Sequence, residues 1–286
     1  MHPIVGVGEL LWDLLPGGRR MAGGAPFNFA FHCQQLGRPA VVVSRVGDDC
    51  LGEELRAAVR DLGLSDEFIQ LDDTHPTGTV PVTLSADGVP SYTIAENVAW
   101  DFIDWTPAVA DLLRAAPAVC VGTLAQRGHS RTAVQAALEA CGGLKVFDVN
   151  LRQLFYDAQT ILRTIARCQW LKATYEELVE VYAALDGPKP PGFRFKMPGL
   201  AVTNGAARSW AKPGPGWEVS EAPGFAVEVV DTVGAGDAFT AALVCGLLAG
   251  RPLPVVLADA NAYAAEVCRH PGPTPQFDWQ LGDRPG

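Results

Sequence analysis

The sequence predicts an α/β protein built on a doubly wound, mostly parallel sheet with helices on both faces. Short apolar runs typical of buried strands recur along the chain, and helical patterns separate several of them. Strands that alternate with helices form βαβ units, whose strands are parallel and covered on both faces. The 286 residues, 48% hydrophobic and 19% charged, are enough for a large core and have an ordinary globular composition. We therefore expect one α/β domain over residues 1–286.

The strands expected in this sheet are short and apolar. The first, Ile4–Val7, is followed by Gly8, which is typical of a buried strand at the point where the chain leaves a sheet. The others cover residues 40–46, 118–122, 145–149, 170–173 and 200–203. The helical patterns among them cover residues 28–36, 52–62, 131–141, 160–168 and 176–184.

Two segments, residues 10–15 and 79–95, interrupt the alternation of strands and helices. Both have β-rich patterns, and a turn at Asp87-Gly88 joins two strands of the second segment with no helix between them. We expect these pieces to form a small antiparallel flap, a lid made from about residues 9–20 and 79–101. Residues 188–198 indicate a surface loop, and the tail from Pro271 is expected to lie over the surface.

The charge and cysteine content exclude some classes of partner. Lys and Arg number 22 and Asp and Glu 32, so the net charge of −10 repels phosphate backbones and anionic membranes. Seven cysteines without a C-x-x-C pair indicate reduced thiols, and the five histidines lack zinc-ligand spacing. The start lacks a signal-peptide pattern, and the longest apolar run, 238–249, is shorter than the roughly 20 residues of a membrane span. We expect a soluble, cytoplasmic protein without a nucleic-acid or membrane partner.

The segment 229–239 contains the strongest chemical motif. Gly234 and Gly236 permit a tight turn with its N–H groups on one side, and the apolar helix that follows, through Leu248, adds its positive N-terminal end. This arrangement predicts an anion hole, and Asp237 beside it is suited to take a proton from a hydroxyl that attacks a bound phosphoryl group. The alternative is a helix-terminal acid that complements the dipole, with purely structural glycines. A dinucleotide fingerprint is excluded because too little chain follows the glycines and a pyrophosphate would face Asp237.

A second group of polar residues lies near the N-terminus. Asp13 follows the first strand closely, and Gly23-Gly24 precede Asn28 at the start of the first helical pattern. The glycine pair lets the backbone approach a ligand, while Asp13 and Asn28 offer acceptor and donor groups suited to a polyhydroxylated molecule. The alternatives are a helix cap for Asn28 and a turn residue of the flap for Asp13.

Together these segments resemble the ribokinase-like, phosphofructokinase B type family of carbohydrate kinases. Its two signatures, G-G-x-x-x-N-x-A and D-T-x-G-A-G-D, match residues 23–30 and 231–237 in the correct order. The resemblance covers essentially the whole chain and includes residues 46–52, 77–78, 203–205 and the final helix ending at Cys268. Within the family, residues 96–101, 122–127 and 148–152 are similar to blocks of the fructokinase branch.

The resemblance implies a ribokinase-like fold with a β lid over a sugar, and transfer of the ATP γ-phosphoryl group to a sugar hydroxyl. It implies Asp237 as the base and an anion hole formed by the amides of Gly234, Ala235, Gly236 and Asp237. The implied sugar-side residues are Asp13, Gly24, Asn28, Trp100, Asp101 and Arg152. The implied ATP-side residues are Thr203, Gly205, Gly234, Gly236 and Asn261. Arg127 and Arg152 are candidates for stabilising phosphate charge, with structural ion pairs as the alternative.

The chain departs from the family pattern at two places. The N-x-x-E element, which in the family helps to organise Mg²⁺ through water, has Thr174 in place of Asn and retains Glu177. Asp231 and Thr232 match part of a monovalent-cation site, for K⁺, although an Asp-Thr pair before a turn is also a common structural cap. The Gly-Ala usual in that cation loop is Gly272-Pro273 here.

The resemblance predicts an ATP- and Mg²⁺-dependent sugar kinase, with conversion of fructose to fructose 6-phosphate as the expected reaction. One rival is a kinase for another sugar, a nucleoside or a sugar acid, since lid residues such as Tyr92, Ile94 and Trp100 set the pocket shape. Another is a non-catalytic ribokinase-fold protein that binds sugar; Thr174 favours it and the retained Asp237 argues against it. An exposed edge on the lid suggests a homodimer.

Overall fold

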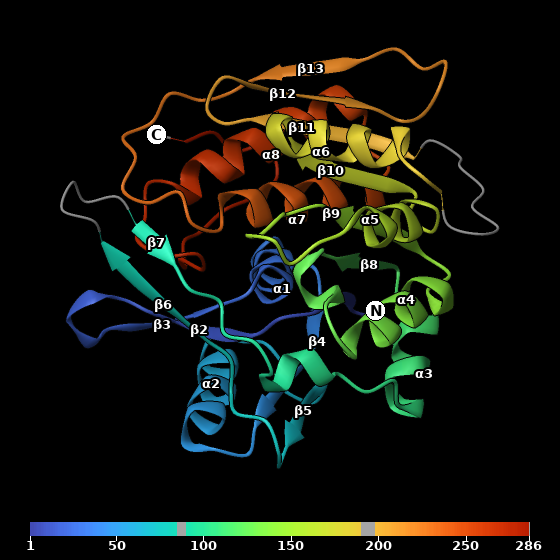
Figure 1. The fold of residues 1–286 in the computed structure, drawn as a ribbon. Helices are drawn as coiled ribbons and strands as arrows, with labels where there is room; N and C mark the ends of the chain where they lie inside the picture. Colours follow the sequence, from blue (N-terminus) through green and yellow to red (C-terminus); the bar gives the residue numbers. More distant parts are fainter. Residues whose placement is uncertain (85–89, 190–197, 286) are drawn as a thin grey trace.

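The computed structural model describes residues 1–84, 90–189 and 198–285, and within them the main sheet has nine strands (Figure 1). In pairing order the strands are β13 (Ser220–Pro223), β12 (Arg208–Lys212), β11 (Gly199–Asn204), β10 (Trp170–Thr174), β9 (Leu144–Asp148), β8 (Ala118–Val121), β1 (Ile4–Val7), β4 (Ala40–Gly47) and β5 (Ile69–Asp72). Neighbours pair in parallel from β11 to β5, whereas β12 and β13 are antiparallel. The doubly wound, mostly parallel sheet is thus confirmed.

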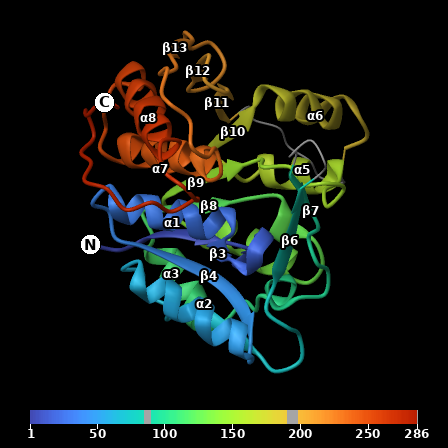
Figure 2. The ribbon, with the colours of Figure 1, turned by 90° about the vertical axis from the view of Figure 1, so that its left-hand side faces the viewer.

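Alternate residues of the strands face two separate apolar cores. Along β4, Val42 and Val46 belong to one core and Val41 and Val43 to the other, because successive side chains of a strand point to opposite faces. The first core is covered by α1 (Ala25–Gln35), α2 (Cys50–Asp61), α7 (Ala235–Leu248) and α8 (Leu253–Val267). The second is covered by α3 (Pro107–Ala115), α4 (Ser130–Ala140), α5 (Ala158–Ile165) and α6 (Tyr175–Asp186). In Figure 2, α7 and α8 lie on one side of β10 and β11, and α5 and α6 on the other.

The helices begin close to the expected positions, with one informative difference. The first starts at Ala25 instead of residue 28, because Gly24 is its N-cap and Pro26 lies in its first turn, where proline is favoured. The described residues also form short 3₁₀ helices, namely η1 (Pro16–Gly18), η2 (Ala99–Phe102) and η3 (Leu124–Gln126). Within the described part of the chain, none of the helices combines the length and the apolar character needed to cross a bilayer.

The lid is a separate sheet with the strand order β3 (Arg20–Gly23), β2 (Leu11–Leu14), β6 (Thr79–Leu84) and β7 (Pro90–Tyr92). In Figure 1 it projects to one side of the main sheet. The β2–β3 and β6–β7 pairs are antiparallel, but β2 and β6 are parallel, so the expectation of a wholly antiparallel flap is wrong. Both strands follow the carboxyl edge of the main sheet, β2 after β1 and β6 after β5, and therefore run in the same direction. The expected turn at Asp87-Gly88 and most of the loop 188–198 lie outside the described residues.

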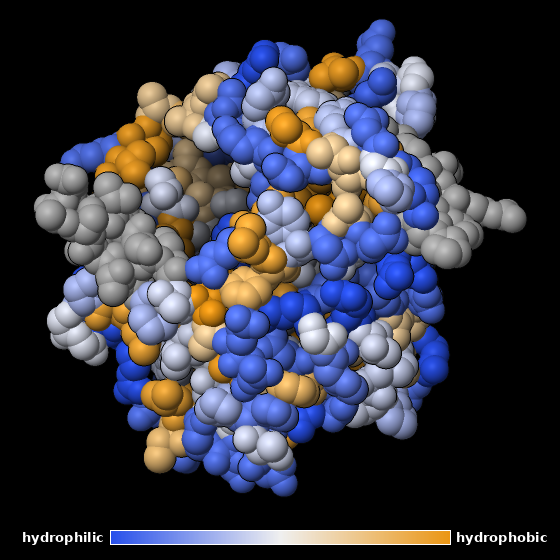
Figure 3. Space-filling view, in the orientation of Figure 1, coloured by the Kyte–Doolittle hydropathy of each residue, from blue (hydrophilic) through white to orange (hydrophobic). Residues whose placement is uncertain are grey.

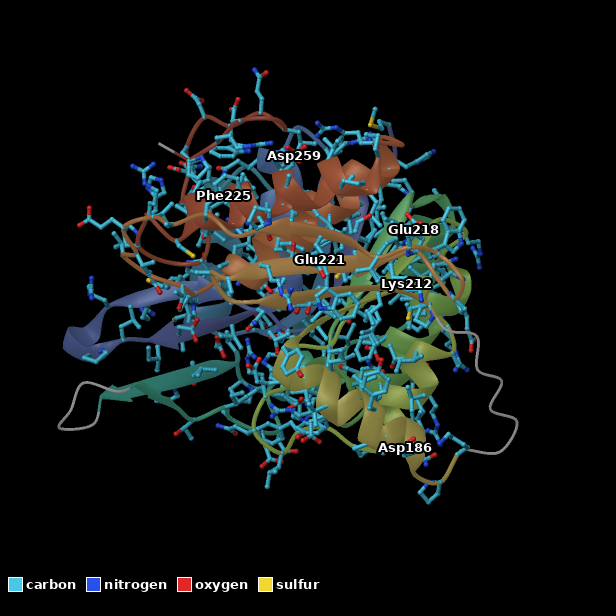
Figure 4. All side chains as sticks on the ribbon, turned by 90° about the horizontal axis from the view of Figure 1, so that it is seen from above. Asp186, Lys212, Glu218, Glu221, Phe225 and Asp259 are labelled. Atoms are coloured by element: carbon cyan, nitrogen blue, oxygen red, sulfur yellow. The ribbon has the colours of Figure 1, made fainter. Side chains whose placement is uncertain are left out.

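The C-terminal tail lies over α8, as expected from its sequence. Arg284 Nη1 lies 3.1 Å from Asp259 Oδ1 on α8, and its guanidinium lies 5.8 Å from the centre of the Phe225 ring; Figure 4 labels both partners. Phe277 and Trp279 of the tail pack around Tyr263, with ring centres 5.7 and 5.8 Å away. The tail thus packs against α8.

Candidate active site

A cavity of about 690 Å³ lies between the lid and the carboxyl ends of the central strands. The lid contributes Leu11, Asp13, Val80 and Ile94, and the start of α1 with the segment after β1 contributes Glu9, Gly24 and Asn28. The remaining wall includes Arg152, Lys172, Thr232, Gly234, Gly236 and Asp237. Figure 3 shows the surface hollowed between the lid and the C-terminal helices. The strand order reverses between β1 and β8, and a crevice at such a position is the usual ligand site of a doubly wound sheet.

Asp237 and Asn28 meet in the cavity wall although 209 positions separate them in the chain. The Asn28 amide donates to Asp237 Oδ2 at 2.8 Å. Burial is the main cause that raises the pKa of Asp237 to about 6, and the hydrogen bond from Asn28 opposes the rise. The carboxylate is therefore mostly ionised at neutral pH, as a proton acceptor must be. The N-caps of the two helices are Gly24 and Gly234, so neither Asn28 nor Asp237 is a helix cap.

The turn before α7 requires glycine. Gly234 has the left-handed φ of 81°, and a Cβ at this position would come within 2.6 Å of the Pro273 carbonyl oxygen. The first N–H groups of a helix have no carbonyl partner inside the helix, and those of Gly236 and Asp237 belong to residues that line the cavity. Ala235 is placed differently, because its N–H donates to the Thr232 carbonyl at 3.3 Å. The turn therefore presents amides and a positive helix end to the cavity, which suits an anion.

The glycine pair before α1 lets the backbone approach Glu9 and the lid residue Asp13 closely. Gly24 has a φ of 116°, and a Cβ there would overlap the Glu9 carbonyl oxygen. A Cβ on Gly23 would lie 2.5 Å from Asp13 Oδ2. Asp13 is partly buried on β2, and burial raises its pKa to about 6 while Arg152 opposes the rise. Asp13, Gly24 and Asn28 are thus brought together at one end of the cavity.

Glu9 belongs to this group and was missed as a site residue. Its side chain is 2% exposed, Oε1 accepts the Ala25 N–H at 3.3 Å, and Oε2 has no hydrogen-bond partner among the described residues. Burial raises the pKa of Glu9 to about 7, against the hydrogen bonds from backbone N–H groups. The signal was present in the sequence: a glutamate two residues after a buried strand stands at the carboxyl edge of the sheet, where sites form.

Two cationic side chains line the cavity in the described structure, Arg152 and Lys172. Arg152 is exposed, lies in the turn after β9, and makes no ion pair among the described residues; its Nη1 donates to the Leu151 carbonyl at 3.1 Å. Lys172 is buried on β10 and lies 3.1 Å from Asp148 Oδ1. Lys172 was also missed, although a lysine inside an apolar strand is rare enough to signal a function.

The structure does not bring Trp100 and Asp101 to the cavity wall. Trp100 is 1% exposed and packs in a small apolar cluster under the lid, and Asp101 accepts from Arg127 Nε at 2.7 Å. The Arg127 guanidinium lies 4.1 Å from the centre of the Trp100 ring. These three residues form a structural support, so the ion-pair alternative is the better interpretation of Arg127. Ile94 does line the cavity, while the side chain of Tyr92 lies outside the described residues.

Thr174 and Glu177 form a capping box at the start of α6. Thr174 Oγ1 accepts the Glu177 N–H at 3.2 Å, while Glu177 Oε2 accepts the Thr174 N–H and Oε1 the Leu151 N–H, both at 2.8 Å. Threonine caps a helix nearly as well as asparagine, which explains why it fits here. Both oxygens of Glu177 thus accept backbone N–H groups, which fixes the orientation of this carboxylate, and neither Thr174 nor Glu177 is part of the cavity wall.

Most of the residues implied for ATP and for a monovalent cation lie outside the cavity wall. Thr203 is the penultimate residue of β11, and Gly205, with a φ of 50°, lies in the turn that follows the strand. Asn261 ties α8 to β13, because its Nδ2 donates to the carbonyls of Ala222 and Pro223 at 3.1 and 2.8 Å. The Asp231 carboxylate accepts the N–H groups of Val233 and Gly272, each at 3.0 Å. Of the implied cation residues only Thr232 lines the cavity, and Thr203, Gly205 and Asn261 are not part of its wall.

Comparison with known proteins gives concordant results. The family described as pfkB family carbohydrate kinase matches residues 15–280. A fructokinase of Klebsiella pneumoniae is 32% identical over 283 residues, which cover 92% of this chain and 90% of the relative. Fructokinase-1 of Zea mays is 30% identical over 269 residues, covering 84% and 81%. A sugar kinase of Pyrococcus horikoshii, solved in complex with ATP, superimposes with a TM-score of 0.81 at 29% identity, covering 95% of this chain and 94% of that one.

Proposed function

Since the chain belongs to the pfkB family of carbohydrate kinases, we propose that it transfers the γ-phosphoryl group of ATP to a hydroxyl of a neutral sugar, fructose, to form fructose 6-phosphate. The observation that carries the proposal is the Asn28–Asp237 contact in the wall of a cavity that ends at the amides of α7. A base and an anion-binding turn side by side are what a hydroxyl and a phosphoryl group require to react.

In the proposed reaction, the sugar lies under the lid and the phosphates lie at the start of α7. Asp237 takes the proton of the attacking hydroxyl, and Asn28 holds the carboxylate in place through its 2.8 Å hydrogen bond. The N–H groups of Gly236 and Asp237 receive the oxygens of the transferred group. Mg²⁺, when bound with ATP, supplies charge neutralisation to the phosphates, and the family resemblance assigns Glu177 to its water shell.

A neutral sugar is favoured over a sugar acid by the charges around the sugar end of the cavity. Glu9, Asp13 and Asp237 place three carboxyl groups there, against the exposed guanidinium of Arg152. Glu9 Oε2 and Asn28 Oδ1 are buried and have no partner among the described residues, so each is a ready acceptor for a sugar hydroxyl. A carboxylate ligand would instead meet repulsion.

Fructose is chosen because the relatives named above from Klebsiella pneumoniae and Zea mays are fructokinases. ATP as the donor is supported by the related sugar kinase of Pyrococcus horikoshii, which was solved with ATP. We place the nucleotide near Thr203, Gly205 and Asn261. Four expectations stay predictions: a requirement for Mg²⁺, a requirement for K⁺, a cytoplasmic location, and pairing of two copies through a lid edge.

The test is ADP release by the purified protein over a panel of acceptors: fructose, glucose, ribose, a nucleoside and a sugar acid. The proposal expects fructose to have the highest kcat/KM, since recognition through hydrogen-bonded hydroxyls discriminates steeply. A higher kcat/KM for another panel member would replace the substrate and leave the kinase assignment intact. Calorimetric sugar binding without any ADP release would instead establish the non-catalytic alternative.

A further inference from the structure

Lys172 is a charged residue in a position where the fold alone would prefer an apolar one. It is the third residue of β10 and only 4% exposed. The preceding Leu171 and following Ala173 belong to the core on one face of the sheet, and Trp170, two positions away, belongs to the core on the other. The lysine side chain therefore points toward the α7 side of the sheet. A buried ammonium group is costly unless it is paired or used.

The ammonium group is held directly beneath the first turn of α7. Its Nζ lies 3.1 Å from Asp148 Oδ1 at the end of β9, and Asp148 Oδ2 accepts from Thr240 Oγ1 of α7 at 2.7 Å. A Cβ on Gly236 would lie 3.1 Å from the same Nζ. Lys172 Nζ is thus held from one side by Asp148 and lies next to the turn that presents the anion-binding amides. Asp148 is its one hydrogen-bond partner within the described structure, which leaves donors for a ligand.

The surrounding charges keep this lysine protonated. Burial alone would lower its pKa, but the carboxylates of Asp148, Glu177 and Asp237 outweigh burial, and the pKa of Lys172 is raised. A structural ion pair needs one carboxylate, whereas three carboxylates surround this ammonium group. A positive charge at this place matters for phosphoryl transfer, because the base Asp237 and the phosphoryl group are both anionic and must approach the same hydroxyl. Arg152 is exposed and its charge is screened by water, whereas the charge of Lys172 acts through a drier medium.

We propose that Lys172 is a catalytic residue whose ammonium contacts the phosphoryl group during transfer, and that Asp148 and Thr240 are positioning residues that hold it under the α7 turn. This inference rests on the proposed kinase function. In the step, the sugar oxygen forms a bond to the γ-phosphorus while the bond from that phosphorus to the bridging oxygen breaks. ADP leaves with the electron pair, Asp237 takes the hydroxyl proton, and Lys172 keeps its own proton and neutralises charge on the transferred oxygens.

Two variants separate this role from a purely structural one. Lys172→Met leaves Asp148 as an uncompensated buried charge and is expected to destabilise the fold. The double variant Lys172→Met with Asp148→Asn removes both charges together, so its melting temperature is expected near that of the wild type. A structural role predicts that the double variant regains activity. A catalytic role predicts that its kcat stays at least about a hundredfold low, as for loss of one charge-stabilising donor, with KM for the sugar within a few-fold.

The experiment measures kcat, both KM values and melting temperature for the wild type, the double variant and Lys145→Met, a matched lysine on neighbouring β9 away from the cavity. A further arm measures kcat of Lys172→Ala with and without added propylammonium, which is expected to restore part of the rate by occupying the vacated space. A folded double variant with near-wild-type kcat would overturn the inference and leave the kinase function standing. A wild-type protein that releases no ADP with any sugar would overturn both.

Discussion

Replacing Asp237 with asparagine is the sharpest single test of the site. The change retains the size of the side chain, its neighbour Asn28 and the backbone amides of the turn, and it removes only the capacity to accept a proton. General-base assistance is typically worth about 10²–10⁴ in rate, equivalent to about 3–5 kcal/mol of barrier. We therefore expect kcat to fall at least about a hundredfold, while the affinity for ATP, measured by calorimetry, stays within a few-fold.

The pH dependence gives a second signature of the same carboxyl group. Because the pKa of Asp237 is raised to about 6 by burial, kcat/KM of the wild type should fall as the pH drops through 6, when the base becomes protonated. The variant should lose the part of this acidic limb that Asp237 contributes, while Asp13 and Glu9, with pKa values of about 6 and about 7, still titrate in this range.

The stability of the wild-type fold should fall as the pH rises, whereas its kcat/KM should rise. A carboxyl group whose pKa is raised in the folded state binds more protons there than in the unfolded chain, so the wild type loses stability as the pH rises from about 4 to about 6. Asp237→Asn should therefore melt at a higher temperature than the wild type at pH 7, with a smaller difference at pH 4. A variant with near-wild-type kcat at pH 7 would refute the assignment of Asp237 as the base, and a lower melting temperature would refute the argument from burial.

Three further substitutions probe other parts of the cavity. Asp13→Ala should raise the KM for sugar more than about tenfold, since a hydrogen bond to a charged group is worth about 1.5–3 kcal/mol; an unchanged KM would remove Asp13 from the site. Gly24→Ala should destabilise the protein by about 1–3 kcal/mol or more, because φ is 116° and the new Cβ would overlap the Glu9 carbonyl, and denaturant unfolding as stable as the wild type would contradict the geometry. Thr174→Asn should lower the Mg²⁺ concentration for half-maximal activity with little change in melting temperature, since both residues cap helices well; an unaltered Mg²⁺ curve would mean that Glu177 and solvent act without position 174.

The sequence predicted the positions of the conformationally special glycines better than it predicted contacts between side chains far apart in the chain. Gly24 and Gly234 were recognised because a left-handed or crowded backbone position leaves a local signature, and both positions have that geometry. The lid strands were predicted from local β patterns. The parallel pairing of β2 with β6 was not, because it depends on where each strand leaves the main sheet.

Glu9 had a local signal, its position after a buried strand, whereas the positions of the other missed or misplaced side chains depend on tertiary packing. Lys172 and Asp148 become a pair only when β9 and β10 lie side by side, and nothing within either strand indicates this. Trp100 and Asp101 were taken from a resemblance block, whereas the contacts with Arg127 that draw them away from the cavity come from a distant segment. Family motifs locate a region of the chain, but the direction of each side chain is decided by tertiary packing.

The hydrogen bond between Asn28 and Asp237 also means that the site is assembled from the two ends of the chain. It joins one of the first helices of the chain to one of the last, between residues 209 positions apart, and His32 of the same helix contacts the carbonyl of Pro273, 241 positions away. Such non-local contacts form late, since the entropy of closing a long loop must be overcome before they are made. The core on this face of the sheet also joins the two ends of the chain, because residues of α1 and α2 pack in it together with residues of α7 and α8. The cavity wall is therefore complete only after α7 has docked against α1, since Asp237 and the glycine turn before α7 form part of that wall.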